Sequence, residues 1–232
     1  MIVFHGAALE SVAPVMIEDI RVGPIVQTPV TRDRPLAAGA NFIRDHQGTR
    51  TIMISFGLLT DDPFARQRQI DAITAWARTK APAPMQLPYH MGKMIDVKCT
   101  GLPEPSARQW WESRLSLTFT AYDPYFYSIA EKSAACGTAF FVAGNAPPRM
   151  RIVRTLESAA SDQQYSDGEN TMTFSTIPAG EMEIDLERQT AAVDNTSIMQ
   201  YYTFGSSFIL PKTGETTITG SGTVKWIERW ET

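Results

Sequence analysis

The stretch LSLTFTAYDPYFY, residues 115–127, is the part of the sequence that decides the fold. Its first seven residues alternate apolar and hydroxyl-bearing side chains, the pattern of a strand with one buried and one polar face. Asp123-Pro124 ends the strand, because proline has no N–H for a sheet ladder and restricts the residue before it. The three aromatics that follow carry too much apolar surface for a free linker. We therefore predict a core strand that ends at a joint between two domains, residues 1–127 and 128–232.

The composition is that of an ordinary globular protein. The 232 residues are 43% hydrophobic and 20% charged, which suits one large or two small domains. A formal net charge of −4 argues against a specific nucleic-acid binder, which needs a dense basic face. The N-terminus lacks a basic segment before a long apolar run, and no window reaches the length of a membrane span. We expect folding in a cytoplasm, with Cys99 and Cys136 as reduced thiols, although a disulfide between them stays open.

The first half of the chain predicts a β domain with one helix laid over a sheet. Asp62 is an acidic N-cap candidate, and Pro63 suits the first helical position, where its missing N–H costs nothing. Apolar residues at helical spacing, with Trp76 as a core anchor, predict a helix over residues 64–79. Strand patterns cover residues 2–5, 14–22, 41–44, 51–58, 86–89, 94–100 and 110–121.

Residues 23–39 interrupt this pattern. They contain Pro24, Pro29 and the segment TRDRP, which together are too proline-rich for a central strand and too charged to bury. We predict an exposed arm or long loop, either a solvated connection or a segment that reaches a neighbouring subunit. The glycine-containing segment 46–49 predicts a hairpin turn that joins the strands at 41–44 and 51–58.

The second half predicts an antiparallel β-sandwich that needs no helix. Short strand patterns recur between turn-forming segments, one of which spans residues 161–170. Residues 187–189 are expected to turn a hairpin, and Glu181, Glu183 and Asp185 alternate outward as on a half-exposed strand. The predicted strands cover residues 149–155, 171–175, 181–186, 190–193, 197–203, 207–210, 216–219 and 223–230.

A search for chemistry finds no active site. The three histidines fall in unrelated segments without metal-ligand spacing, there is no nucleophile elbow or phosphate loop, and nothing marks out a glycosidase carboxylate pair. We predict a protein that is not an enzyme and has no metal or cofactor. Aromatics are the remaining lead, since flat rings stack on sugars, and Trp226 and Trp230 are the candidate glycan contacts. Adjacent aromatics such as Trp110-Trp111 point to opposite faces of a strand, which favours core or subunit contacts instead.

Taken together, the pieces resemble the distal tail protein family of long-tailed bacteriophages and prophages. The likeness spans nearly the whole chain and rests on an ordered set of segments rather than on one diagnostic motif. The segments are RDRP at 32–35, GTRTIMI at 48–54, the helix with QI at 69–70 and AWA at 75–77, LTF at 117–119 with YDPYFY at 122–127, GNAPP at 144–148, MEIDL at 182–186, and GTVKW at 222–226 with RW at 229–230.

The resemblance implies a structural protein of the virion tail tip, assembled in the bacterial cytoplasm. It implies an N-terminal β domain with one helix that forms a homohexameric ring, and a C-terminal galectin-like or jelly-roll β-sandwich. The ring would join the tail tube to the baseplate hub, with the tail tube protein, the tape-measure protein, the tail-tip hub protein and, where present, a receptor-binding protein as partners. No membrane partner is implied. The competing hypothesis is a carbohydrate-binding adhesion module that uses the sandwich.

A ring of head-to-tail contacts needs two different complementary patches on each subunit. The exposure signals of the arm and of the turn around Gln47-Gly48 make these segments the candidate suppliers. The predicted subunit contacts are Arg32, Asp33, Arg34, Gln47 and Arg50.

Overall fold

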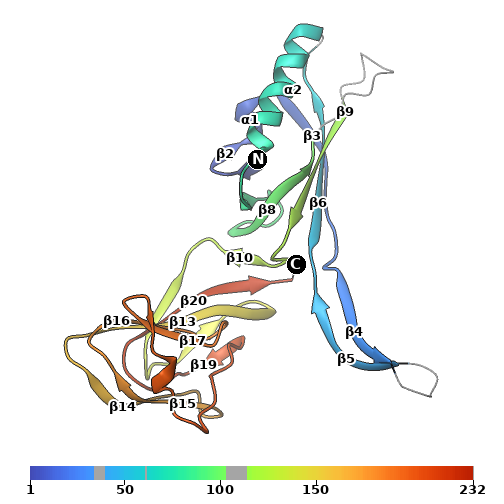
Figure 1. Ribbon diagram of the computed structural model, residues 1–232. Helices are drawn as coiled ribbons and strands as arrows, with labels where there is room; N and C mark the ends of the chain where they lie inside the picture. The colour runs from blue at the N-terminus through green and yellow to red at the C-terminus, as the bar shows by residue number, and fades with distance from the viewer. Residues whose placement is uncertain (34–39, 61, 103–113, 232) are drawn as a thin grey trace. The chain divides into compact units, whose positions relative to one another are not determined.

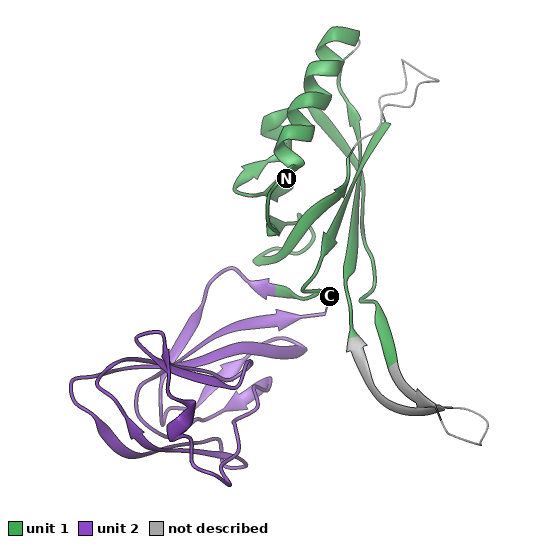
Figure 2. Cartoon of the chain, in the orientation of Figure 1, with its two compact units in different colours: residues 1–126 green, residues 127–232 purple. Residues whose placement is uncertain are grey.

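The computed structural model describes residues 1–33, 40–60, 62–102 and 114–231, and it describes side chains outside residues 30–46. Contacts divide the chain into two compact units, Met1–Phe126 (unit 1) and Tyr127–Thr232 (unit 2), as Figure 2 shows. The short strand β10 (Phe126–Ser128) contains the boundary. Strands dominate both units, so the predicted mainly β fold class is confirmed.

Unit 1 is built on one antiparallel sheet (Figure 1). Its strand order is β3–β6–β9–β8–β7–β1–β2. The alternating segment at the start of the sequence analysis forms β9, whose apolar residues are buried while its hydroxyl-bearing residues lie on the other face. The strands are β1 (Val3–Phe4), β2 (Ala7–Ala8), β3 (Val15–Val22), β4 (Gln27–Asp33), β5 (Ala40–Gln47), β6 (Arg50–Leu58), β7 (Ala83–Gln86), β8 (Lys93–Gly101) and β9 (Arg114–Ala121).

The predicted helix is α2 (Pro63–Ala77), and it begins as its sequence indicates. The carboxylate of Asp62 accepts hydrogen bonds from the backbone N–H groups of Phe64 and Ala65, at 3.1 and 3.0 Å. Trp76 anchors the helix, because its indole meets the rings of Phe4 and Phe119 edge to face, at centroid distances of 5.5 and 6.3 Å. A second helix that the sequence analysis did not predict, α1 (Leu9–Val12), is a single turn.

The arm prediction is wrong in part, because residues 27–33 form strand β4 and pair antiparallel with β5. The predicted hairpin between β5 and β6 is also wrong, since residues 48–49 continue the chain from one strand into the other. Across from them, the N–H of Val26 donates to the carbonyl of Thr49 at 3.1 Å. The carbonyl of Val26 accepts from the N–H of Gly48 at 2.7 Å. The pair β3–β6 therefore continues into the pair β4–β5, and Figure 1 shows this two-stranded extension leaving the sheet. Pro29 is compatible with a two-stranded extension, where one side of each strand needs no ladder partner.

Unit 2 contains a larger antiparallel sheet and two further strand pairs. The sheet order is β18–β17–β16–β13–β20–β11, while β14 pairs with β15 and β12 pairs with β19. The predicted hairpin through residues 187–189 is confirmed as the connection of β16 to β17. The strands are β11 (Lys132–Ala135), β12 (Phe140–Val142), β13 (Ala146–Leu156), β14 (Ala160–Ser166), β15 (Thr171–Ile177), β16 (Gly180–Asp185), β17 (Thr190–Val193), β18 (Thr196–Ser197), β19 (Gly214–Thr216) and β20 (Thr223–Trp230).

Buried side chains from the sheet and from both strand pairs form one core in unit 2. Three predictions fail around this core. Residues 161–170 were expected as a turn, but most of them belong to β14, in which Tyr165 is the buried anchor. Residues 197–203 and 207–210 were expected as strands. The first contains the one-turn 3-10 helix η1 (Met199–Tyr201), and residues 207–210 have no regular structure.

Candidate functional site

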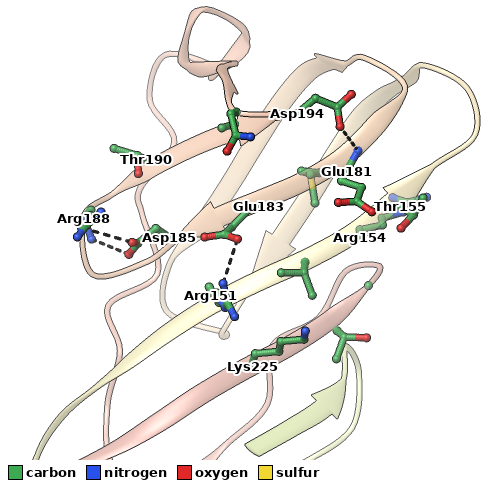
Figure 3. Close-up of a pocket in the computed structure, with 16 residues that line it drawn as sticks. Arg151, Arg154, Thr155, Glu181, Glu183, Asp185, Arg188, Thr190, Asp194 and Lys225 are labelled. Carbon is green, nitrogen blue, oxygen red and sulfur yellow. Dashed lines mark hydrogen bonds and ion pairs between the residues drawn. The ribbon is translucent and has the colours of Figure 1, made fainter. Parts of the chain in front are cut away.

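The outward face of the unit 2 sheet carries a shallow groove of about 860 Å³, which we call the charged groove (Figure 3). Strands β13, β16, β17 and β20 supply most of its lining, together with the turn between β17 and β18. Its lining residues include four cations and four carboxylates, which are Arg151, Arg154, Arg188, Lys225, Glu181, Glu183, Asp185 and Asp194.

Strand register assembles the groove. Arg151 on β13 lies opposite Asp185 on β16 and opposite Lys225 on β20, so three charged residues stand in one row across the sheet. Glu183 lies one row away, opposite Val153. The alternating pattern of β16 predicts its carboxylates on an exposed face, but it does not predict their proximity to Arg151 and Lys225. Only the pairing of strands distant in sequence reveals that proximity.

Ion pairs within unit 2 satisfy much of this charge. The guanidinium of Arg151 contacts Glu131 at 3.0 Å and Glu183 at 3.1 Å. Arg188 lies 3.8 Å from Asp185 within the β16–β17 hairpin. These groups are partly exposed, so each pair is expected to contribute less than about 1 kcal/mol to stability.

The turn between β17 and β18 closes one end of the groove. Asp194 and Asn195 both have positive φ values, 48° and 62°, as a type I′ turn requires. The carboxylate of Asp194 accepts a hydrogen bond from the backbone N–H of Glu181 at 3.0 Å and so ties the turn to β16. The groove is thus a rigid polar surface with balanced charge. Its described lining contains no aromatic ring on which a sugar would stack.

The two candidate glycan contacts lie on β20. Trp226 is only 4% exposed and stacks on Phe140 with a centroid distance of 4.5 Å. Its assignment as a glycan contact is therefore wrong, because a sugar ring needs an exposed aromatic face. Trp230 is half-buried, and its role stays a prediction.

The predicted ring contacts have different outcomes. Gln47 is exposed at the end of β5, and its role as a ring contact stays a prediction. Arg50 is not a surface residue, since it is 3% exposed and its guanidinium lies over the ring of Phe126, 5.4 Å from the centroid. Arg34 and the side chains of Arg32 and Asp33 lie outside the described part of the structure, as does the Trp110-Trp111 pair.

Cys99 and Cys136 are free thiols, and burial raises the pKa of each. Across the described ranges, no three His, Cys, Asp or Glu side chains gather as a metal site would require. No helix in these ranges is long and apolar enough to cross a membrane.

Both units are thus antiparallel β structures, with one capped helix on the sheet of unit 1 and a polar sheet face in unit 2. No protein-family model and no curated protein matches the sequence. Among solved structures, the chain is similar to the Dit protein (gp 19.1) of SPP1, described as a paradigm of the hub adsorption apparatus in phages that infect Gram-positive bacteria. The TM-score is 0.76, the identity is 13%, and 98% of each chain is covered.

A chain of the phage P2 baseplate in its activated conformation with Ca also matches, with a TM-score of 0.40 and 8% identity over 94% of this chain and 91% of that one. A similarity this low adds nothing to the argument. The match to SPP1 Dit shows a shared fold across the whole length. The resemblance to distal tail proteins is therefore confirmed at the level of the fold.

Proposed function

We propose that this protein is a structural distal tail protein of a phage or prophage, whose subunits form a hexameric ring between the tail tube and the tail-tip hub. The observation that carries the proposal is the full-length similarity of fold to SPP1 Dit, which includes both units and leaves almost none of either chain unmatched. Because a fold shared at low identity gives function only by analogy, the surfaces of the two units provide the further support.

Two features of unit 1 support self-assembly. The first is the extension formed by β4 and β5, which leaves the main sheet. The second is the edge of β3, because within the described residues this eight-residue strand pairs only with β6. An open edge presents unpaired N–H and C=O groups to a further strand. Two unlike surfaces on one subunit are what a closed head-to-tail ring requires.

The groove supports a structural role for unit 2 better than a carbohydrate-binding one. Sugar sites use an aromatic platform together with polar groups. The described lining of the charged groove supplies polar groups but no aromatic ring, and Trp226 is buried in the core of unit 2. Under the proposal, the tail tube protein, the tape-measure protein and the tail-tip hub protein are the ring's partners, a receptor-binding protein is a further one, and the virion tail tip is its location.

The proposal is tested by measuring the mass of the purified full-length protein by light scattering and imaging the same fraction by negative-stain electron microscopy. The expected result is a six-subunit particle with a central hole. A strict monomer at high concentration contradicts a self-assembling ring. A glycan array on the same sample separates the alternatives, because selective glycan binding that Trp230→Ala weakens would favour the adhesion module.

A further inference from the structure

Residues 87–93 of unit 1 form a tight double turn between β7 and β8. The N–H of His90 donates to the carbonyl of Leu87, and the N–H of Lys93 donates to the carbonyl of His90, each at 3.1 Å. Gly92 has a φ of 76°, as the third residue of a type II turn requires. Tyr89 and Met91 are 82% and 89% exposed, so the double turn presents two large apolar side chains to solvent.

Two side chains of the double turn face inward, the buried Leu87 and the half-buried His90. The imidazole of His90 stacks on the ring of Phe126, with a centroid distance of 4.2 Å and an interplanar angle of 18°. Phe126 is fully buried, so it offers a fixed surface. Because the N–H and the carbonyl of His90 each make one of the two turn hydrogen bonds, a displacement of His90 would disturb both turns.

The two charged groups that lower the pKa of His90 are both cations. Lys93 lies at the start of β8, and Arg50, at the start of β6, has its guanidinium over the same Phe126 ring. Burial, with Lys93 and Arg50 as the smaller causes, lowers the pKa of His90 below its ordinary value of 6.5. Burial also lowers the pKa of Lys93. A proton on the imidazole would therefore add a third positive charge to a partly desolvated cluster.

We propose that the double turn is a pH-sensitive switch. The neutral imidazole of His90 holds residues 87–93 against Phe126, and protonation of His90 releases them. Release changes how Tyr89 and Met91 are presented and leaves the core beneath Phe126 in place. The stabilisation of the closed turn by neutral His90 is complete at a pH above 6.5, the ordinary pKa of the imidazole. It is lost as the pH falls through the lowered pKa that His90 has in the folded protein.

The test is amide hydrogen exchange on the full-length protein from pH 8 to pH 4.5, expressed as protection factors to remove the intrinsic pH dependence. The protection of the His90 and Lys93 amides is expected to fall severalfold as the pH falls, because protonation of the imidazole favours the open turn. The midpoint of the fall should coincide with the imidazole titration of His90 measured by NMR. The amides of β9 should keep their protection throughout.

Two variants serve as controls. His90→Phe keeps a flat ring for stacking and cannot be protonated, so its protection should stay constant across the pH range. His5→Asn removes another imidazole at a turn whose φ of 51° suits asparagine, and it should behave as the wild type. The proposal is overturned if the imidazole of His90 titrates without any change in amide protection. It is equally overturned if His90→Phe loses protection in parallel with the wild type.

Discussion

At the scale of single residues, Trp226 shows how burial decides between two roles. Truncation by Trp226→Ala leaves a large cavity beside Phe140 and should lower the free energy of unfolding of unit 2 by about 3–5 kcal/mol. The indole N–H has no acceptor among the described residues, so Trp226→Phe, which removes the N–H and keeps a ring, should cost much less. Urea denaturation of the three proteins provides the measurement. Equal losses for both variants would contradict a packing role.

The candidate site was only partly predictable from single residues. The alternation of Glu181, Glu183 and Asp185 placed carboxylates on an exposed face, and the structure agrees. Arg50, by contrast, follows a glycine-containing turn signal and so has the sequence context of a surface arginine. Its burial against Phe126 depends on a contact 76 positions further along the chain, which no local pattern encodes.

At the scale of elements, the start of α2 depends on one side chain. Asp62→Ala removes the acceptor for two backbone N–H groups and should lower the free energy of unfolding of unit 1 by about 1 kcal/mol. Asp71→Ala is the matched control, because Asp71 is an acid on the same helix that accepts only a side-chain hydrogen bond from Gln67. Thermal unfolding followed by circular dichroism compares them, and an equal effect of both substitutions would argue against capping.

The extension formed by β4 and β5 permits a clean deletion. Val26 and Gly48 are already hydrogen-bonded across the ribbon, so an Asn-Gly turn in place of residues 27–47 should close the shortened hairpin without strain. We expect unit 1 to fold with a nearly unchanged melting temperature and the protein to lose ring assembly. Light scattering and circular dichroism measure the two properties. Intact rings from the shortened protein would remove the extension from the assembly mechanism.

Elements with strong periodicity were predictable, and elements stabilised mainly by their partners were not. The alternation in β9 and the helical spacing in α2 report burial directly. Strand β14 is mostly polar, with Tyr165 as its buried anchor, so its pairing with β15 is invisible in its own pattern. Strand β4 contains Pro29 and two charged residues, which are tolerated because the extension lies beyond the core sheet. Residues 197–203 show the opposite error, since their apolar content packs through the 3-10 turn η1 rather than through a strand.

At the scale of the whole molecule, each unit has a buried core of its own. The core of unit 2 is formed by residues of that unit. We expect two calorimetric transitions, each with an unfolding enthalpy of about 60–90 kcal/mol for a unit of this size. Trp226→Phe should shift one transition and Asp62→Ala the other. If both substitutions move a single common transition, the units unfold together.

One indole in each unit, the half-buried Trp76 and the buried Trp226, can serve as an optical reporter. The N–H of Trp76 donates to the carbonyl of Ala7 at 3.1 Å, whereas the N–H of Trp226 has no acceptor among the described residues. An indole without a polar partner in an apolar core emits at shorter wavelength than a hydrogen-bonded one. Difference spectra between the wild type and the variants Trp76→Phe and Trp226→Phe would therefore assign a redder emission to Trp76 of unit 1 and a bluer emission to Trp226 of unit 2. Fluorescence of the unlabelled protein then reports which unit responds when a ring forms or a tail partner binds.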